Sequence, residues 1–111
     1  MIDLKNESNI ILHENVAGFV IKCKNCGEIT VSFGNIISHM TEKEFINLFH
    51  GMNKIMNDLH QFTVMISESE KVIVRSPIEN LIFSFEINDF HQIIELLDQA
   101  KLSLDIRKIM N

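Results

Sequence analysis

The sequence predicts an α+β domain in which a largely antiparallel sheet of about five to six strands is covered by two helices. Segments that alternate apolar and polar residues, as strands do, dominate the first third of the chain. Two segments with a helical apolar period follow, one after residue 41 and one after residue 88. Because hairpin-like connections outnumber crossovers, antiparallel pairing is favoured.

The first third of the chain is expected to form strands. Residues 10–13 and 17–23 are rich in β-branched side chains and flank the turn-like pair Glu14-Asn15. Residues 29–33 alternate between apolar and polar and predict a half-buried strand. Gly34-Asn35 then breaks the alternation, as a turn or bulge does, and residues 36–40 continue extended or lead to the next element.

A first helix is predicted from Thr41 to around His60. Thr41 and Glu44 have the spacing of a capping box, in which each side chain bonds the backbone of the other. Gly51 lies inside this helix at a cost of about 1 kcal/mol relative to Ala. The apolar residues behind the cap recur at helical spacing and form one stripe: Phe45, Leu48, Phe49, Met52, Ile55, Met56 and Leu59.

The second half predicts three strands and a second helix within a single domain, residues 1–111. Residues 62–66 and 72–74 bracket a polar hairpin turn, and residues 81–87 form a strand after the turn at Pro77. Asn88 or Asp89 is expected to cap the second helix. Residues 102–111 fit either a strand or a helix, and we favour a helix restarted near Ser103. The inward face of the second helix is predicted to hold Phe90, Ile93, Ile94, Leu97 and Ala100.

Composition argues against several classes of protein. The chain has a net charge of −5 and no Lys- or Arg-rich segment, so we expect no nucleic-acid binding. No apolar run approaches the ~18–20 residues that a membrane span requires, and no membrane association is expected. Residues 1–8 are polar and do not resemble a signal peptide. We therefore expect a cytoplasmic protein with reduced thiols.

The candidate for chemistry is the segment 23–27, Cys-Lys-Asn-Cys-Gly, which holds both cysteines of the chain. Two intervening residues let both sulfurs reach one metal ion from a tight turn. Structural zinc takes four ligands, so Cys23 and Cys26 need help from elsewhere. His13 and His39 lie in strand-like segments that flank the cysteine turn and are the candidate ligands within the chain. Alternatively, the cysteine pair of a second copy completes the site and zinc clamps a homodimer.

Two other interpretations of the cysteine pair stay open. A thioredoxin-like redox pair lies at a helix N-terminus, whereas here a strand follows and the activating dipole is missing. Cysteines also serve as small buried apolar residues without a site. No phosphate loop, nucleophile elbow or metalloprotease helix motif occurs in the sequence. We therefore expect a non-enzymatic domain, a homodimer with a structural zinc at Cys23 and Cys26, that acts through contacts with a protein partner. The alternative is a small-ligand-binding or thiol redox protein.

The cysteine turn also carries a family resemblance. Residues 23–36, Cys-Lys-Asn-Cys-Gly-Glu-Ile-Thr-Val-Ser-Phe-Gly-Asn-Ile, are followed by Thr-Glu-Lys-Glu-Phe at 41–45. This stretch resembles a family of short bacterial proteins in which a Cys-x-x-Cys turn precedes a strand ending in Phe-Gly-Asn and then a capped helix. The resemblance covers roughly residues 10–60. It implies a stand-alone single-domain protein, and the family has no assigned activity.

Overall fold

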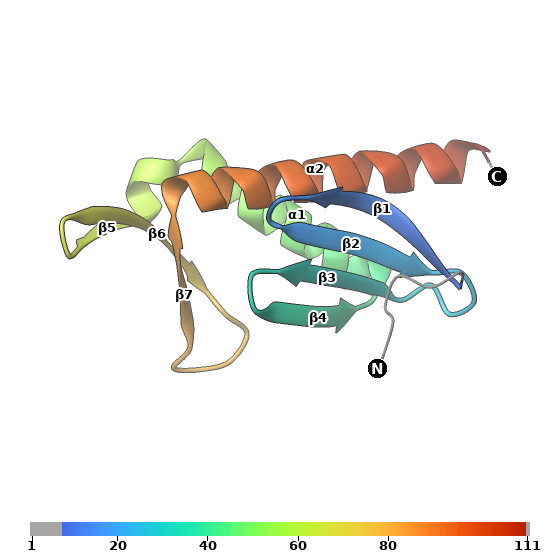
Figure 1. Ribbon diagram of the computed structural model, residues 1–111, viewed down its shortest axis with the longest axis horizontal. Coiled ribbons are helices and arrows are strands. Elements are labelled where there is room, and N and C mark those ends of the chain that lie inside the picture. Colours follow the sequence, from blue (N-terminus) through green and yellow to red (C-terminus); the bar gives the residue numbers. More distant parts are fainter. Residues whose placement is uncertain (1–7, 111) are drawn as a thin grey trace.

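Two antiparallel sheets and two long helices make up the structure, a computed structural model that describes residues 8–110 (Figure 1). Residues 1–7, which include most of the polar N-terminal segment, and residue 111 lie outside the described part. The first sheet is a meander of β1 (Asn9–Asn15), β2 (Gly18–Cys23), β3 (Ile29–Phe33) and β4 (Ile36–Met40). Helix α1 (Glu42–Asn57) and the short 3-10 helix η1 (Leu59–Phe62) follow. The second sheet comprises β5 (Thr63–Ile66), β6 (Ser69–Arg75) and β7 (Ile82–Glu86), and helix α2 spans Ile87–Met110.

The α+β class and the order strands, helix, three strands, helix are confirmed. The division of the strands differs from the expected single sheet of about five to six strands, because residues 8–110 contain seven strands in two sheets. Strand β4 pairs with β3, and β5 pairs with β6. Helix α1, at 16 residues, carries the chain roughly 24 Å between β4 and β5, so the second set of strands begins away from the first sheet.

Helix α2 lies along both sheets and organises the core (Figure 1). It contacts β1 and β2 of the first sheet, β6 and β7 of the second, and α1. Its five predicted inward residues are all buried, and Leu96 and Leu104 join them. The core that they share with the other elements includes Val20, Ile29, Val31, Phe45, Met52 and Val72.

The start of α1 is capped as the sequence predicts. The Thr41 hydroxyl accepts a hydrogen bond from the Glu44 N–H at 3.1 Å, and the Glu44 carboxylate accepts one from the Thr41 N–H at 2.9 Å. The helix ends at Asn57 rather than near His60, because the chain tightens into η1 at Leu59. The apolar stripe continues through that 3-10 turn, which explains why the pattern overestimates the α-helix.

Helix α2 begins earlier than predicted, and it continues without a break through the tail for which we favoured a helix. It begins at Ile87, directly after β7, so neither Asn88 nor Asp89 is its cap. It passes Ser103 without a restart, because Leu104 is buried and keeps the last turns packed on the domain. None of the helices in residues 8–110 has both the length and the apolar character that crossing a membrane requires.

Candidate functional site

The two cysteines lie at the tip of the β2–β3 hairpin. Cys23 is the last residue of β2, and Cys26 lies in the turn that precedes β3. The Cys23 N–H donates to the Glu28 carbonyl at 2.9 Å, and the Gly27 N–H donates to the Cys23 carbonyl at 3.0 Å. Gly27 has a φ of +75°, the left-handed conformation that a residue with a Cβ adopts only with strain. We call residues 23–27 the cysteine knuckle.

Both sulfurs of the cysteine knuckle are free thiols, and they interact with each other. The Cys26 N–H donates to the Cys23 Sγ at 3.2 Å. Hydrogen bonds from the Cys26 thiol, the Cys26 N–H and the Asn25 N–H lower the pKa of Cys23 below its ordinary value. The pKa of Cys26 is raised, because its thiol donates to Cys23 and deprotonation breaks that bond. Cys23 is therefore the sulfur that ionises first.

Basic side chains surround the Cys23 side of the knuckle. A hollow of about 440 Å³ beside this residue is lined by Lys22, Lys24 and Arg107, together with the apolar Ile10 and Met110. Arg107 comes from the last turn of α2, 84 positions along the chain from Cys23. The Lys22 ammonium lies 3.6 Å from the Glu42 carboxylate, and the hydrogen bonds from Cys26 and Asn25 are what lower the pKa of Cys23.

The two histidines predicted as metal ligands have other partners. The Nε2 of His13, on β1, lies 3.3 Å from the Glu95 carboxylate on α2. The Nδ1 of His39, on β4, lies 2.8 Å from the Thr30 hydroxyl and 3.5 Å from the Glu28 carboxylate. Within residues 8–110 no group of three or more His, Cys, Asp or Glu side chains is arranged to hold a metal ion. The structure thus brings the two cysteines together and leaves each histidine on a separate strand.

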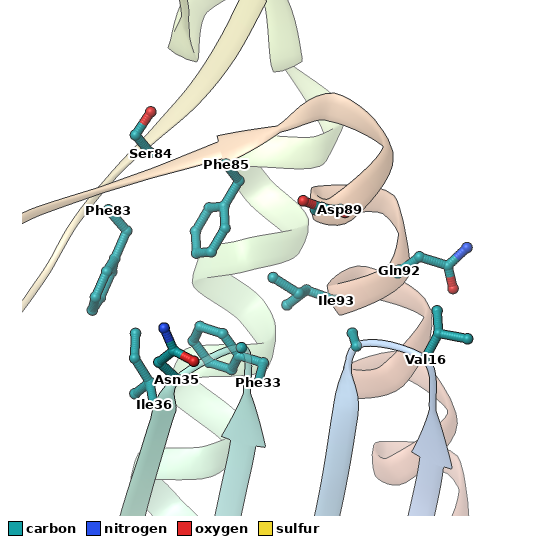
Figure 2. A pocket seen from close by; sticks show the side chains of 12 residues that line it. Val16, Phe33, Asn35, Ile36, Phe83, Ser84, Phe85, Asp89, Gln92 and Ile93 are labelled. Carbon is teal, nitrogen blue, oxygen red and sulfur yellow. The ribbon is translucent and has the colours of Figure 1, made fainter.

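A second hollow lies where the two sheets meet the start of α2, and Figure 2 shows it from close by. Its volume is about 420 Å³. The ring of Phe33, on β3, lies 6.4 Å from that of Phe83 and 5.9 Å from that of Phe85, both on β7. We call this hollow the aromatic cleft. Its other lining residues are Val16, Ala17, Gly34, Asn35, Ile36, Ser84, Asp89, Gln92 and Ile93.

Comparison with known proteins adds a family. A family model described as "Family of unknown function (DUF6686)" matches residues 4–110, nearly the whole chain. The chain belongs to DUF6686. No curated protein and no solved structure gives a significant match. Membership agrees with the expected family of unassigned activity, and the described residues of this DUF6686 protein offer two candidate sites, the cysteine knuckle and the aromatic cleft.

The aromatic cleft of this DUF6686 protein was not predicted from the sequence. The eight Phe residues of the chain are spaced as core residues, and no Trp or Tyr marks a binding surface. Phe83 and Phe85 lie two positions apart on β7 and therefore on one face of the strand. This spacing was the one indication of the cleft in the sequence. The ring that completes the cleft, Phe33, is 50 positions away from Phe83, so the grouping depends on how the two sheets meet.

Proposed function

We propose that this DUF6686 protein is a non-enzymatic interaction domain whose cysteine knuckle holds a structural zinc ion together with the same knuckle of a second copy. The observation that carries the proposal is the 3.2 Å hydrogen bond from the Cys26 N–H to the Cys23 Sγ at an accessible hairpin tip. Zinc-bound thiolates are stabilised by donors in the surrounding shell, and a backbone N–H is such a donor. Both sulfurs belong to one turn, so one ion can be bound by the two of them. The proposal places the protein in the cytoplasm, where thiols stay reduced.

A second copy is part of the proposal because the knuckle offers half of a tetrahedral site. Structural zinc takes four protein ligands. His13 and His39 contact Glu95 and Thr30 through one ring nitrogen each, and within residues 8–110 neither belongs to a group of three or more His, Cys, Asp or Glu side chains arranged to hold a metal ion. Two hairpin tips that meet on a two-fold axis supply four sulfurs, as two symmetry-related pairs of Cys23 and Cys26. The dimer is then the form that contacts a further protein partner.

Charge supports the same arrangement. Four thiolates outweigh the charge of one Zn²⁺, so a four-cysteine site is negative overall. Lys24 and Arg107 line the hollow beside Cys23 and would partly offset that charge, whereas the Lys22 ammonium lies 3.6 Å from the Glu42 carboxylate. The net charge of the whole chain is −5, which makes a local concentration of basic groups at the sulfurs stand out.

Thiol–disulfide exchange is the second candidate function. Its support is the closeness of the two free thiols, one half-buried and one exposed. Against it, strand β3 follows the knuckle, so no helix dipole activates the first cysteine. In this function Cys23 and Cys26 would cycle between dithiol and disulfide with an external oxidant and reductant.

Elemental analysis of protein purified without added metal, combined with its mass in solution, tests the proposal. We expect a dimer with about one zinc ion per two chains. Cys26→Ser should lose the zinc and dissociate into monomers, whereas Asn25→Ser, in the same turn, should keep both. Zinc at one ion per chain would point to ligands other than the second knuckle. Absence of metal in a protein whose thiols oxidise reversibly would favour the redox function.

A further inference from the structure

We propose that the aromatic cleft binds a small organic cation with an apolar body, such as an alkyl- or arylammonium. The inference does not depend on zinc or on a dimer, because the cleft lies on elements other than the cysteine knuckle. It is built from the turns at one end of the first sheet, from β7 and from the start of α2 (Figure 2). Its volume of about 420 Å³ lies within the range of small-molecule sites.

Three phenylalanine rings form the apolar part of the cleft. Phe33 meets Phe83 edge-on, with ring planes at 78°, and the centroids of Phe83 and Phe85 are 6.0 Å apart. The ring of Phe85 packs on that of Phe90, which is fully buried, so the Phe85 ring is held by the core. The three lining rings are only half-buried, so they retain free surface for a ligand. The face of an aromatic ring is negative and attracts a cation.

The charge of the cleft selects the sign of the ligand. Of the described residues that line it, Asp89 is the only one with a charged side chain. Its carboxylate is exposed and has no ion-pair partner within residues 8–110. In Figure 2 the Asp89 side chain turns toward Phe85, on the same side of α2 as Ile93, whereas Gln92 points away. A carboxylate on the Phe85 side of a cleft lined by aromatic rings suits an ammonium group and repels an anion.

A neutral polar group at the rim completes the site. Asn35, in the β3–β4 turn, lies at the cleft and can accept or donate hydrogen bonds, whereas the Ser84 side chain points away from the rings in Figure 2, as its alternation with Phe83 and Phe85 on β7 requires. An ammonium headgroup has several N–H donors, and the carboxylate and amide oxygens of the rim are acceptors for them. The apolar body of the ligand would cover the half-buried rings.

A matched series of three probes tests the proposal: 3-phenylpropylammonium, 3-phenylpropanol and 3-phenylpropionate share one apolar body and differ in headgroup charge. Binding is followed by ¹H–¹⁵N NMR titration in an amine-free, low-salt buffer. We expect the cation to bind roughly tenfold more tightly than the alcohol, and the anion more weakly than both. The shifted amides should be those of Gly34, Asn35, Ser84 and their neighbours.

Two variants separate the charge from the rings. Asp89→Asn should weaken binding of the cation by roughly threefold to fivefold and leave the alcohol unchanged. The control Glu70→Gln removes one negative charge from the β5–β6 hairpin, away from the cleft, and should change the affinity for neither the cation nor the alcohol. Phe83→Leu keeps apolar bulk but removes a ring face, so it should reduce the preference for the cation over the alcohol.

The proposal is overturned by equal affinity for all three probes, by no detectable binding of any of them, or by shifts confined to residues outside the cleft. It is also overturned if Asp89→Asn binds the cation as wild type does. Melting curves of each variant, recorded without probe, show whether the domain is intact. If Phe83→Leu melts at a lower temperature than wild type, Phe83→Met replaces it, since Met has similar bulk and no ring.

Discussion

The Lys108 ammonium, in the last turn of α2, donates a hydrogen bond to the carboxylate of Glu42, the first residue of α1. The Lys22 ammonium, on β2, lies 3.6 Å from the other oxygen of the same carboxylate. Glu42 therefore links the beginning of one helix to the end of the other and to the first sheet. The bond from Lys108 is the main cause that lowers the pKa of Glu42, and partial burial opposes it.

This linkage predicts a loss of stability in acid. The ordinary pKa of a glutamate is 4.5, and the folded value is lower, so the ionised carboxylate contributes fully above pH 4.5 and loses its contribution as pH falls through the folded pKa. We expect Glu42→Gln to reduce the free energy of unfolding by about 0.5–1 kcal/mol at neutral pH. That deficit should shrink below pH 4.5. Urea unfolding at several pH values checks this, with the exposed Glu79→Gln as control.

The capping box predicts a cost for losing the Thr41 hydroxyl. Thr41→Ala leaves the Glu44 N–H without its acceptor and should lower the free energy of unfolding by about 1 kcal/mol. Thr41→Ser retains the hydroxyl and should stay close to wild type. The midpoint of urea unfolding measures both. Equal midpoints for the Ala and Ser variants would show that the cap contributes nothing.

Two glycines should respond to alanine in opposite directions. A Cβ at Gly18 would lie 1.8 Å from the Ser32 carbonyl oxygen, which belongs to the adjacent strand and cannot move away alone. Gly18→Ala should therefore destabilise the domain by more than about 3 kcal/mol. Nothing lies within 4 Å of a Cβ at Gly51, inside α1, so Gly51→Ala should stabilise by up to about 1 kcal/mol. Thermal unfolding of the two variants side by side is the measurement; destabilisation by Gly51→Ala would contradict the prediction.

Histidine substitutions distinguish the ways of completing a zinc site. If two knuckles share the ion, His13→Gln and His39→Gln should leave the zinc content of the purified protein unchanged. His39→Gln should still lower stability slightly, since its side chain bonds the nearly buried Thr30. Elemental analysis of both variants gives the answer. Loss of zinc from either one would assign that histidine as a ligand and reject the shared four-cysteine site.

Local features of the fold could be predicted from the sequence because local residues determine them. The capping box at Thr41 and the five inward residues of α2 depend on spacing within one helix. The division into two sheets could not be predicted, because alternation shows that a segment is a strand but not which strand it pairs with. The uninterrupted course of α2 past Ser103 depends on burial of Leu104 by the rest of the fold.

The candidate sites also have parts that could be predicted from the sequence and parts that could not. The cysteine knuckle could be predicted, since both thiols belong to one turn. The positions of His13 and His39 relative to the cysteine knuckle could not be predicted, because each histidine contacts a residue on another element. The same holds for Asp89 and Phe33, which meet at one cleft only after α2 and both sheets have packed.

The position of α2 in the sequence has a consequence for synthesis. Every strand within residues 8–110 precedes this helix, and β1, β2, β6 and β7 contact it. During translation these strands therefore leave the ribosome before α2 does. Their residues that pack on α2 stay exposed to water until the helix has been made. A chain truncated after Glu86 should accordingly be digested by protease far faster than the chain of residues 1–111.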